Sequence, residues 1–315
     1  MKVAVTIPCY KVRNQILSAV ENIGSEISKV YVVDDCCPQH SGKFVEENCH
    51  DPRVTVITHT RNQGVGGAVC TGYRAAVNDG MEIIIKIDGD GQMDTSLIPK
   101  FIQPIVEGKA DYTKGSRFYS IHSLESMPGV RKLGNAVLSF VNKFSSGYWN
   151  IMDPTNGYTA IHHRAISMLP FEKINKRYFF ESDMLFRLGT IRAVVRDIPM
   201  DAKYADEESS LSIGKVLLEF PPLYLKAFLK RVFYNYFLRD FNGASVELVA
   251  GILLLLFGMI FGGVHWADSI ITNNAATTGT VMISVLPIIL GFQLVLSAIT
   301  FDMNNVPKDT LSSMD

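Results

Sequence analysis

Residues 81–92, MEIIIKIDGDGQ, decide the fold class of this chain. The stretch begins as an isoleucine-rich run and ends in two aspartates, Asp88 and Asp90, each followed by a glycine. A short β-branched run that ends in a turn signal indicates a buried, usually parallel strand. The two carboxylates then lie where the strand leaves the sheet. Open α/β sheets bind their ligands at this carboxyl edge.

The side chains at this edge suggest a metal site. Two carboxylates and the amide of Gln92 suit a hard divalent cation, which prefers oxygen ligands and often shares them with a substrate phosphate. We therefore predict that Asp88, Asp90 and Gln92 bind a metal ion. An ordinary turn at the end of a strand is the alternative, because Asp and Gly are common turn residues.

Composition narrows the class of protein. The 315 residues carry a formal net charge of −1 and no long Lys/Arg run, which argues against a nucleic-acid partner. The five cysteines are odd in number and lack CxxC spacing, so neither a disulfide framework nor a zinc site is expected. Reduced thiols in a domain that faces the cytosol are the simpler account. The apolar run in residues 1–10 is too short for a signal peptide and predicts a strand.

Strand and helix signals alternate through the first two thirds of the chain, as is typical of βαβ units. The pattern predicts an α/β fold with a doubly wound sheet. Helices are expected at 14–23, 97–106, 130–144 and 178–188, and a further one opens in residues 61–68 and ends near residue 78. Strands are expected at residues 2–7, 30–34, 53–58, 83–87, 110–114 and 193–198, with a short one after the turn at 153–158.

The character of the sequence changes near residue 212. Residues 213–240 are apolar with lysines at helical spacing, and Pro221-Pro222 should split them into two helices. Such a segment suits a membrane interface, and a packed helix pair is the alternative. Residues 248–264 and 281–301 contain no charged residue and approach the roughly 20 residues that a bilayer core needs. Gly258, Gly262 and Gly263 would allow these two spans to pack closely, and buried soluble helices are the alternative.

The charge pattern predicts how the chain crosses the membrane. Basic residues precede the first span, whereas the connection at 265–280 has no Lys or Arg. The positive-inside rule then places the N-terminal domain and the C-terminus in the cytoplasm of an integral membrane protein, most simply in a bacterial inner membrane. The expected parts are a catalytic domain (1–210), amphipathic juxtamembrane helices (211–242), a two-helix transmembrane anchor (243–305) and a short cytoplasmic tail (306–315).

Further polar residues lie at strand exits or helix starts, which converge on one crevice in a doubly wound sheet. Asp34 and Asp35 can accept hydrogen bonds from a ribose or a base. The glycine-rich residues 62–68 suit a phosphate-binding helix start, with a plain close-packing turn as the alternative. The planar fork of Arg117 matches phosphate oxygens, unless this arginine is structural. Arg131 opens a helix between the globular and membrane-associated parts, where a solvated charge is the alternative.

Six motifs follow one another along the first half of the chain. They are Ile7-Pro8-Cys9-Tyr10, Val32-Val33-Asp34-Asp35, Arg61-Asn62-Gln63-Gly64, Asp88-Gly89-Asp90-Gly91-Gln92, Gly115-Ser116-Arg117 and Asp153-Pro154-Thr155-Asn156-Gly157-Tyr158. In this order they resemble the motifs of family-2 glycosyltransferases. Their order and spacing are similar to those of the polyprenyl-phosphate branch, which is typified by dolichol-phosphate mannosyltransferase. The resemblance covers roughly residues 1–210, and the two C-terminal spans fit membrane-anchored members.

The resemblance implies a GT-A fold, a nucleotide-sugar donor, Mg²⁺ or Mn²⁺, and an undecaprenyl or dolichyl phosphate as acceptor. The reaction would be an inverting hexosyl transfer, in keeping with a role in cell-envelope polysaccharide, and a homo-oligomer is compatible with the sequence. The donor-binding set would be Pro8, Tyr10, Asp34, Asp35, Asn62, Gly64 and Asp88. The catalytic set would be Asp88, Asp90, Arg117, Arg131 and Asp153, with both arginines at phosphates.

The chain departs from the family pattern in four places. Position 12 is Val where relatives often carry an acidic residue, which affects the contact to the base. Cys37 stands where Ser is usual, and Asn135 occupies a place where a small hydroxyl residue would help to hold the acceptor phosphate. Residues 204–211, YADEESSL, replace the basic segment of many relatives, so the identity of a loop that closes over the donor is open.

The expected function is transfer of a sugar from a nucleotide sugar to a polyprenyl phosphate at the cytoplasmic membrane face. An ionised phosphate already carries a nucleophilic oxygen, so positioning and charge neutralisation would supply most of the catalysis. Asp153, Glu181 and Asp183 are candidates for orienting the acceptor or acting as a base. The alternatives are a glycosyltransferase that acts on a sugar hydroxyl, which needs such a base, and a nucleotide-sugar-binding membrane protein without turnover.

Overall fold

The computed structural model describes residues 1–119, 129–201 and 213–314 and divides them into two compact units. The first unit comprises Met1–Arg231 and Pro307–Asp315, and the second comprises Val232–Val306. The first unit therefore extends well past residue 210, where the sequence suggested a boundary, and it includes the C-terminal tail.

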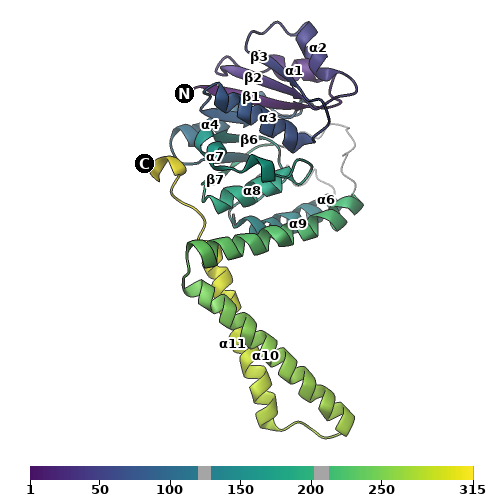
Figure 1. The fold of residues 1–315 in the computed structure, drawn as a ribbon, viewed down its shortest axis with the longest axis vertical. Coiled ribbons are helices and arrows are strands. Elements are labelled where there is room, and N and C mark those ends of the chain that lie inside the picture. Colours follow the sequence, from purple (N-terminus) through teal and green to yellow (C-terminus); the bar gives the residue numbers. More distant parts are fainter. Residues whose placement is uncertain (120–128, 202–212, 315) are drawn as a thin grey trace. The chain divides into compact units, whose positions relative to one another are not determined.

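A seven-stranded sheet in the order β3-β2-β1-β4-β6-β5-β7 forms the centre of the first unit (Figure 1). All strands expected from the sequence are present, and β4 lies in the middle. The sheet is mixed, because β6 runs antiparallel to both of its neighbours. The strands are β1 (Val3–Cys9), β2 (Lys29–Asp34), β3 (Val54–Thr58), β4 (Ile83–Lys86), β5 (Tyr112–Ser116), β6 (Thr159–His162) and β7 (Val195–Pro199).

The reversed direction of β6 positions the site. Thr159, the first residue of β6, pairs with Lys86, the last residue of β4. Thr159 also pairs with Lys114 near the end of β5. The turn at residues 153–158 precedes β6 and is therefore brought to the carboxyl edge of β4 and β5. A parallel strand would have carried this turn to the opposite edge.

Helices cover both faces of the sheet, as the alternation of side chains along β1 shows. Val3, Val5 and Ile7 point into a core that also contains residues of α1, α2 and α4. Thr6 points to the other face, where a side chain at Gly72 of α3 would clash with it. The helices of this unit are α1 (Ile16–Glu21), α2 (Ser41–Asn48), α3 (Val65–Asn78), α4 (Ile98–Val106), α6 (Gly129–Ser146), α7 (His163–Met168), α8 (Phe180–Thr190) and α9 (Ile213–Phe233). The sequence did not predict α2 or α7.

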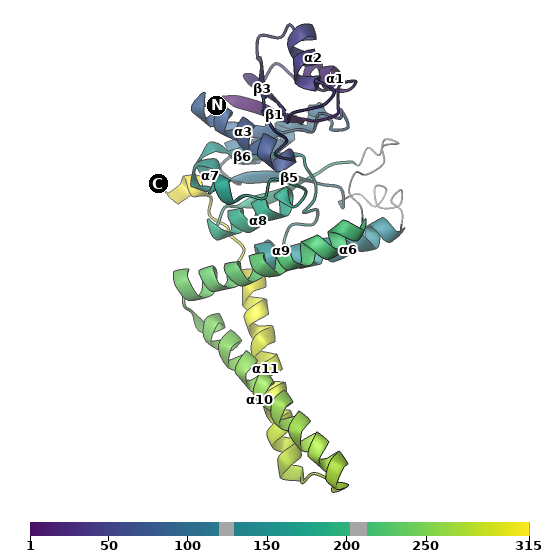
Figure 2. The ribbon, with the colours of Figure 1, turned by 45° about the vertical axis from the view of Figure 1, so that its right-hand side comes forward.

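Helices α6 and α9 lie side by side in both views (Figures 1 and 2). Phe144 of α6 and Phe228 of α9 meet edge to face with ring centroids 6.2 Å apart. The expected break at Pro221-Pro222 is wrong, because α9 is continuous across both prolines. Both prolines lie on the exposed surface of α9, and the helix tolerates the two N–H donors that they lack.

The C-terminal tail packs on the sheet domain. The backbone N–H of Leu311 donates to both carboxylate oxygens of Asp111 at 3.0 and 3.2 Å. The Thr310 hydroxyl donates to the carbonyl of Gly108 at 3.1 Å. Asp111 is buried and accepts a further hydrogen bond from the N–H of Val194. Residues 310 and 311 are therefore part of the first unit, although some 200 residues separate them from Asp111.

The second unit is a pair of long apolar helices, α10 (Gly243–Thr272) and α11 (Thr278–Asn304), that pass length and composition tests for membrane spans. They approach most closely at Gly251 and Gly291, where an added Cβ atom on either residue would meet the other's carbonyl oxygen within 3 Å. Gly258 packs in the same way against Ile288, as expected. The expectation for Gly263 is wrong, because a Cβ atom there would meet nothing within 4 Å.

Candidate active site

The turn after β4 carries the predicted metal ligands. Asp90 accepts a hydrogen bond on Oδ1 from the backbone N–H of Gln92 at 3.0 Å, which closes the turn. Gly91 adopts a positive φ of 72°, a conformation that glycine adopts without strain. Two carboxylates and one amide therefore lie within five residues, and they fit a hard divalent cation.

The surroundings of this turn also fit a metal that is shared with a substrate. Within the described parts of the chain, no group of three or more His, Cys, Asp or Glu residues could hold a metal by itself. Asp88, Asp90 and Gln92 would thus leave coordination positions to oxygens of a substrate, as is usual for Mg²⁺ at phosphate sites.

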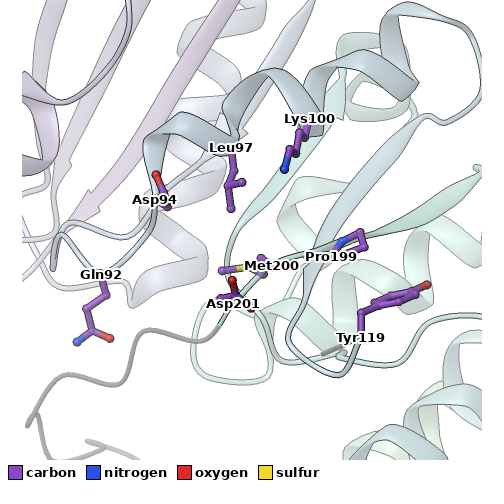
Figure 3. Close-up of a pocket in the computed structure, with 8 residues that line it drawn as sticks. All are labelled: Gln92, Asp94, Leu97, Lys100, Tyr119, Pro199, Met200 and Asp201. Carbon is purple, nitrogen blue, oxygen red and sulfur yellow. The ribbon is translucent and has the colours of Figure 1, made fainter. Parts of the chain in front are cut away.

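A cavity of about 330 Å³ lies beside Gln92 (Figure 3). Gln92 follows β4, Tyr119 follows β5, and Asp201 follows β7, so the cavity lies at the common carboxyl edge of these strands. Lys100 of α4 also lines it. A hollow with an aromatic ring, an ammonium group and carboxylates suits a polar ligand that carries hydroxyl or phosphate groups.

Lys86, which the sequence analysis missed, is the last residue of β4 and contacts Asp88 of the predicted metal-binding turn. Its side chain is 2% exposed, and Nζ lies 2.9 Å from Oδ1 of Asp88 and 3.2 Å from Oε1 of Glu181. Burial disfavours the ammonium form, but the charges and hydrogen bonds of Asp88 and Glu181 outweigh it and raise the pKa of Lys86 above its ordinary value. Its signal in the sequence was a single charge inside an otherwise apolar strand.

Gly157 provides the space for this ion pair. A Cβ atom at residue 157 would lie 2.4 Å from Nζ of Lys86 and 2.7 Å from Oδ2 of Asp88. The glycine in the turn at 153–158 is therefore required by the close approach of the backbone to Lys86 and Asp88.

Arg117 and Asp153 form a bidentate ion pair next to this turn. Nε of Arg117 lies 2.7 Å from Oδ2 of Asp153, and Nη2 lies 2.9 Å from Oδ1. Asp153 is 1% exposed, and its burial by itself would raise the pKa of the carboxyl. The hydrogen bonds and the charge of Arg117 outweigh that effect and hold the pKa of Asp153 below its ordinary value.

A second buried lysine, Lys114 of β5, binds the same turn from the other side. Its ammonium group donates to the carbonyl of Asn156, and burial lowers the pKa of Lys114 to about 8. Asp197 of β7 is a neighbouring charge, and burial raises the pKa of Asp197 to about 6. Oδ2 of Asp197 accepts from the N–H of Met152 at 2.8 Å, whereas Oδ1 has no hydrogen-bond partner among the described residues.

We expect Asp197→Asn to stabilise the protein at pH 8. A carboxyl whose pKa rises from 3.8 to about 6 on folding destabilises the folded state by up to about 3 kcal/mol once it is ionised. Between pH 3.8 and 6 the folded state binds a proton that the unfolded state has released. The gain in unfolding free energy from Asp197→Asn should therefore be complete above pH 6 and vanish near pH 4. Thermal unfolding of the purified chain at pH 8 and pH 4 measures it. Glu46→Gln on the exposed face of α2 is the control, and an equal shift in melting temperature at both pH values would contradict the prediction.

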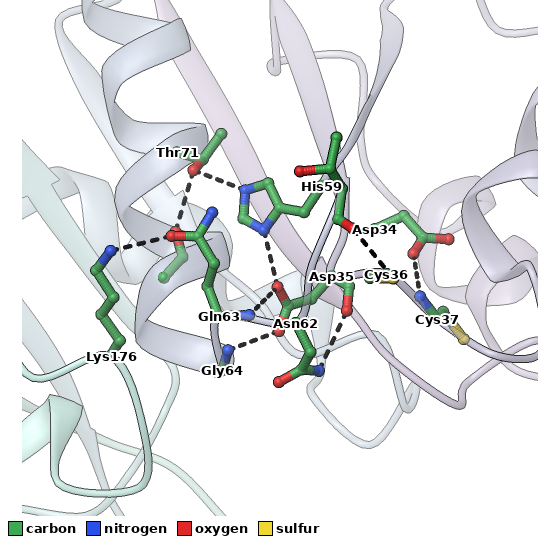
Figure 4. Close-up of polar contacts among 12 residues, drawn as sticks. Asp34, Asp35, Cys36, Cys37, His59, Asn62, Gln63, Gly64, Thr71 and Lys176 are labelled. Atoms are coloured by element: carbon green, nitrogen blue, oxygen red, sulfur yellow. Dashed lines mark hydrogen bonds and ion pairs between the residues drawn. The ribbon is translucent and has the colours of Figure 1, made fainter.

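Asp34 and Asp35 are 3% and 2% exposed, and both serve the backbone around them (Figure 4). Asp34 accepts from the N–H groups of Cys37 and Gly42 at 2.7 and 2.6 Å. Asp35 accepts from the N–H groups of Gln63 and Gly64 at 2.8 and 2.7 Å. The pair therefore joins the loop after β2 to the start of α3. Direct contact of either carboxylate with a nucleotide stays a prediction.

His59, which the sequence analysis also missed, holds Asp35 from the opposite side (Figure 4). Its Nδ1 lies 2.8 Å from Oδ1 of Asp35, and its Nε2 lies 2.9 Å from the hydroxyl of Thr71. Asn62 completes the group by donating from Nδ2 to the carbonyl of Asp35 at 3.1 Å. The sequence offered one clue to His59: it directly follows the strand expected at residues 53–58, at the same sheet edge where Asp34 ends its own strand.

The glycine-rich segment is a close-packing turn in this structure. Gly64 has a φ of 88°, and a Cβ atom there would lie 2.3 Å from the carbonyl oxygen of Lys176. The N–H groups of Gly66 and Gly67 both donate to that same oxygen at 3.0 and 3.3 Å. These amides are thus engaged by Lys176, and of the two alternatives for this segment the geometry supports packing.

Pro8 and Tyr10, which were predicted to bind the nucleotide-sugar donor, lie at the end of β1. Pro8 lies within β1, and Tyr10 directly follows it with 43% of its surface exposed, which leaves the ring accessible to a base. Cys37 is buried, and its sulfur accepts from the N–H of Lys11 at 3.0 Å, so it supports the loop that carries Tyr10. Val12 is partly buried and packs beside Gly89.

The other predicted residues fall in three places. Arg131 lies in the first turn of α6, but its side chain is outside the described residues, as are all of residues 204–211. Asn135 lies one turn further along α6. Asp183 of α8 accepts from Nε of Arg187 at 2.9 Å and from the N–H of Asn175 at 2.7 Å.

Comparison with known proteins identifies this arrangement. The model of the family described as glycosyl transferase family 2 matches residues 4–169, which include the DGD turn, Arg117 and Asp153. The chain belongs to glycosyl transferase family 2. It is accordingly a glycosyltransferase, as the motifs indicated.

Relatives of this family-2 glycosyltransferase include enzymes whose names specify lipid phosphates. The UDP-N-acetylglucosamine–dolichyl-phosphate N-acetylglucosaminyltransferase of Methanococcus voltae is 29% identical over 239 residues, which are 71% of this chain and 94% of the relative. The undecaprenyl-phosphate mannosyltransferase of Micrococcus luteus is 28% identical over 207 residues, 64% of this chain and 83% of the relative.

A solved structure supports the GT-A fold that the resemblance implied. Glucosyl-3-phosphoglycerate synthase from Mycobacterium tuberculosis, in complex with Mn²⁺, UDP-glucose and phosphoglyceric acid, superposes with a TM-score of 0.54. The match covers 73% of this chain and 79% of the other, at 14% sequence identity. At that identity the likeness shows the fold alone.

Proposed function

We propose that this glycosyltransferase transfers a sugar from a nucleotide sugar to a polyprenyl phosphate at the cytoplasmic face of a membrane. The names of the relatives support the acceptor class. The observation that carries the proposal is that the three carboxylates suggested by the sequence as possible bases are each held by a cation. Asp153 pairs with Arg117, Glu181 pairs with Lys86, and Asp183 pairs with Arg187.

This pairing favours a phosphate over a sugar hydroxyl as the nucleophile. A hydroxyl group needs a base that accepts its proton as the new bond forms. Asp153 is a weak base: burial alone would raise the pKa of its carboxyl, but the hydrogen bonds and charge of Arg117 hold that pKa below its ordinary value. The carboxylates of Glu181 and Asp183 are engaged by Lys86 and Arg187. A phosphate oxygen is ionised at neutral pH and needs no such partner. The acceptor in the proposed reaction is therefore activated before it binds.

The proposed chemistry is a direct displacement at the anomeric carbon of the donor sugar. A phosphate oxygen of the acceptor bonds to that carbon, the bond to the diphosphate breaks, and its electron pair leaves with the nucleoside diphosphate, so the configuration inverts. Asp88, Asp90 and Gln92 would hold Mg²⁺ or Mn²⁺, which stabilises the charge on the leaving diphosphate. Arg117 holds Asp153 of the turn at 153–158, whose Gly157 packs against Asp88, and it would stabilise phosphate charge in the transition state.

A screen of labelled nucleotide sugars tests the acceptor class. The full-length chain in membrane vesicles should label undecaprenyl or dolichyl phosphate in a metal-dependent reaction. The matched control is the corresponding free polyprenol, which has the same lipid tail without the phosphate and should stay unlabelled. Transfer to the free alcohol, or to a soluble sugar with no need for lipid phosphate, would refute the proposal and favour the hydroxyl-acceptor alternative.

The second unit supports attachment to a membrane. Many large apolar side chains of α10 and α11 are exposed, among them Leu253, Ile260 and Ile289. An apolar surface of this extent in a soluble protein would be covered or would aggregate, whereas lipid covers it in a bilayer. Because residues 1–231 and 307–315 belong to one unit, two crossings between them leave the catalytic domain and the tail on the same side.

We expect cysteine labelling of intact cells to show this topology. In a background with the exposed Cys36 replaced by Ser, a membrane-impermeant maleimide should label Asn274→Cys between the two helices from outside. Lys308→Cys in the tail should react only after lysis, since basic residues precede the first span and the 265–280 connection has none. Labelling of Lys308→Cys in intact cells would show the opposite orientation.

A further inference from the structure

Lys86 contacts one of the predicted metal ligands, Asp88, and a second carboxylate, Glu181, that is not among those ligands. Its ammonium group contacts Oδ1 of Asp88 and Oε1 of Glu181, and only 2% of its side chain is exposed. Glu181, in the first turn of α8, is 14% exposed, whereas Asp88 is 33% exposed and carries the outward-facing part of the cluster. The ammonium is enclosed by the protein and lies close to the backbone of Gly157, so a cation bound at Asp88 would lie next to it.

The packing around Lys86 leaves room for its ammonium group and for little else. Gly157 approaches so closely that any side chain there would displace Lys86 or Asp88. The matched buried lysine, Lys114, enters the same turn but donates to the carbonyl of Asn156 instead of a metal-site carboxylate. The chain thus places one buried cation on the metal-site carboxylate and another away from it.

We propose that Lys86 is a positioning residue that holds Asp88 and Glu181 and thereby keeps the affinity for free metal low until the diphosphate of the donor arrives. This inference rests on the proposed function and deepens it. A divalent ion bound to Asp88 shares that carboxylate with Lys86, so part of the negative charge is already neutralised. Glu181 contacts the same ammonium, so its negative charge offsets part of the positive charge that faces Asp88. The diphosphate supplies the missing negative charge, and metal and donor then bind together.

Removing the ammonium should therefore tighten binding of the metal alone. Lys86→Met keeps a long unbranched side chain, removes one positive charge from Asp88 and releases Glu181. We expect the dissociation constant for Mn²⁺ to fall about tenfold or more, because a unit charge in contact with the same carboxylate is lost. A residue that merely supported the fold would, on removal, weaken binding or leave it unchanged.

The experiment is a titration of the purified full-length chain with Mn²⁺ alone, followed by the electron paramagnetic resonance signal of free Mn²⁺. Glu181→Gln leaves Lys86 in place with one negative charge fewer, and it should weaken binding about tenfold. The double variant Lys86→Met/Glu181→Gln restores the net charge and should bind within about threefold of the wild type. Lys114→Met, the control for loss of a buried ammonium, should change binding less than about threefold.

Weaker or unchanged Mn²⁺ binding by folded Lys86→Met would overturn the inference. If Lys86→Met does not fold, Glu181→Gln decides alone, and unchanged or tighter binding by that variant overturns it. Asp90→Asn in the same titration tests the assignment of the metal site separately from the role of Lys86. If Asp90→Asn binds Mn²⁺ like the wild type, the metal site itself is misassigned. If only Lys86→Met behaves like the wild type, the metal site stands and the role of Lys86 fails.

Discussion

Asp90→Asn should lower kcat/KM for sugar transfer about 10²- to 10³-fold while the protein stays folded. The variant keeps the size of the side chain and an oxygen that can accept the hydrogen bond from the N–H of Gln92, so the turn should persist. It removes one of the two negative charges of the predicted metal site. A metal that stabilises a leaving diphosphate contributes several kcal/mol, and a loss of about 3–4 kcal/mol corresponds to this factor.

The measurement combines transfer kinetics over a range of Mn²⁺ concentrations with thermal unfolding. Asp79→Asn is the control, because Asp79 is an exposed aspartate before β4, at the end opposite to the DGD turn. It should transfer sugar at the wild-type rate. Full activity of Asp90→Asn, or a wild-type rate that survives a chelator, would show that Asp88, Asp90 and Gln92 do not form the metal site.

The parts of this site that the sequence predicted are those that depend on local signals. The isoleucine-rich run before Asp88 has the length and composition of a buried strand, and the DGD triplet marks its exit. Arg117 likewise follows a short strand through Gly115-Ser116. In each case the chemistry lies within a few residues of the element that positions it, so spacing along the chain was sufficient.

The parts that were missed depend on residues far apart in the sequence. Lys86 meets Glu181 over 95 positions, and Gly64 meets Lys176 over more than 100. The antiparallel direction of β6 brings the turn at 153–158 to the site, but four strand residues carry no signal for direction. The tail contact between Leu311 and Asp111 spans 200 positions. No periodicity within one segment encodes such pairs.

Arg131→Ala should chiefly weaken use of the lipid phosphate and leave metal-dependent donor binding nearly intact. Donor and acceptor bring several phosphate charges into one crevice, and a single divalent ion cannot neutralise all of them. Arg131 begins α6, which packs on α9, the helix that leads out of the first unit toward the two apolar helices. The loss of one charge-assisted contact costs about 1.5–3 kcal/mol, which is roughly a ten- to hundredfold loss in the use of acceptor.

Arg117→Ala should impair both substrates and also destabilise the protein. Arg117 directly follows β5, and its Nε and Nη2 hold the buried carboxylate of Asp153. Removing one partner of a buried pair costs about 3–5 kcal/mol of stability, because the remaining charge is uncompensated. The double variant Arg117→Ala/Asp153→Asn avoids that charge, so its defect in substrate use reports on phosphate binding rather than on folding.

Calorimetric titration of the donor, together with transfer kinetics over a range of lipid-phosphate concentrations, separates the two arginines. For Arg131→Ala we expect a raised KM for the lipid phosphate and a donor affinity within about threefold of the wild type. For Arg117→Ala/Asp153→Asn both donor affinity and acceptor use should fall. We base this division on two positions: Arg117 holds the turn at 153–158, whose Gly157 packs against Asp88, whereas Arg131 lies in the first turn of α6. If Arg131→Ala abolished donor binding and left the dependence on acceptor unchanged, Arg131 would belong to the donor site instead.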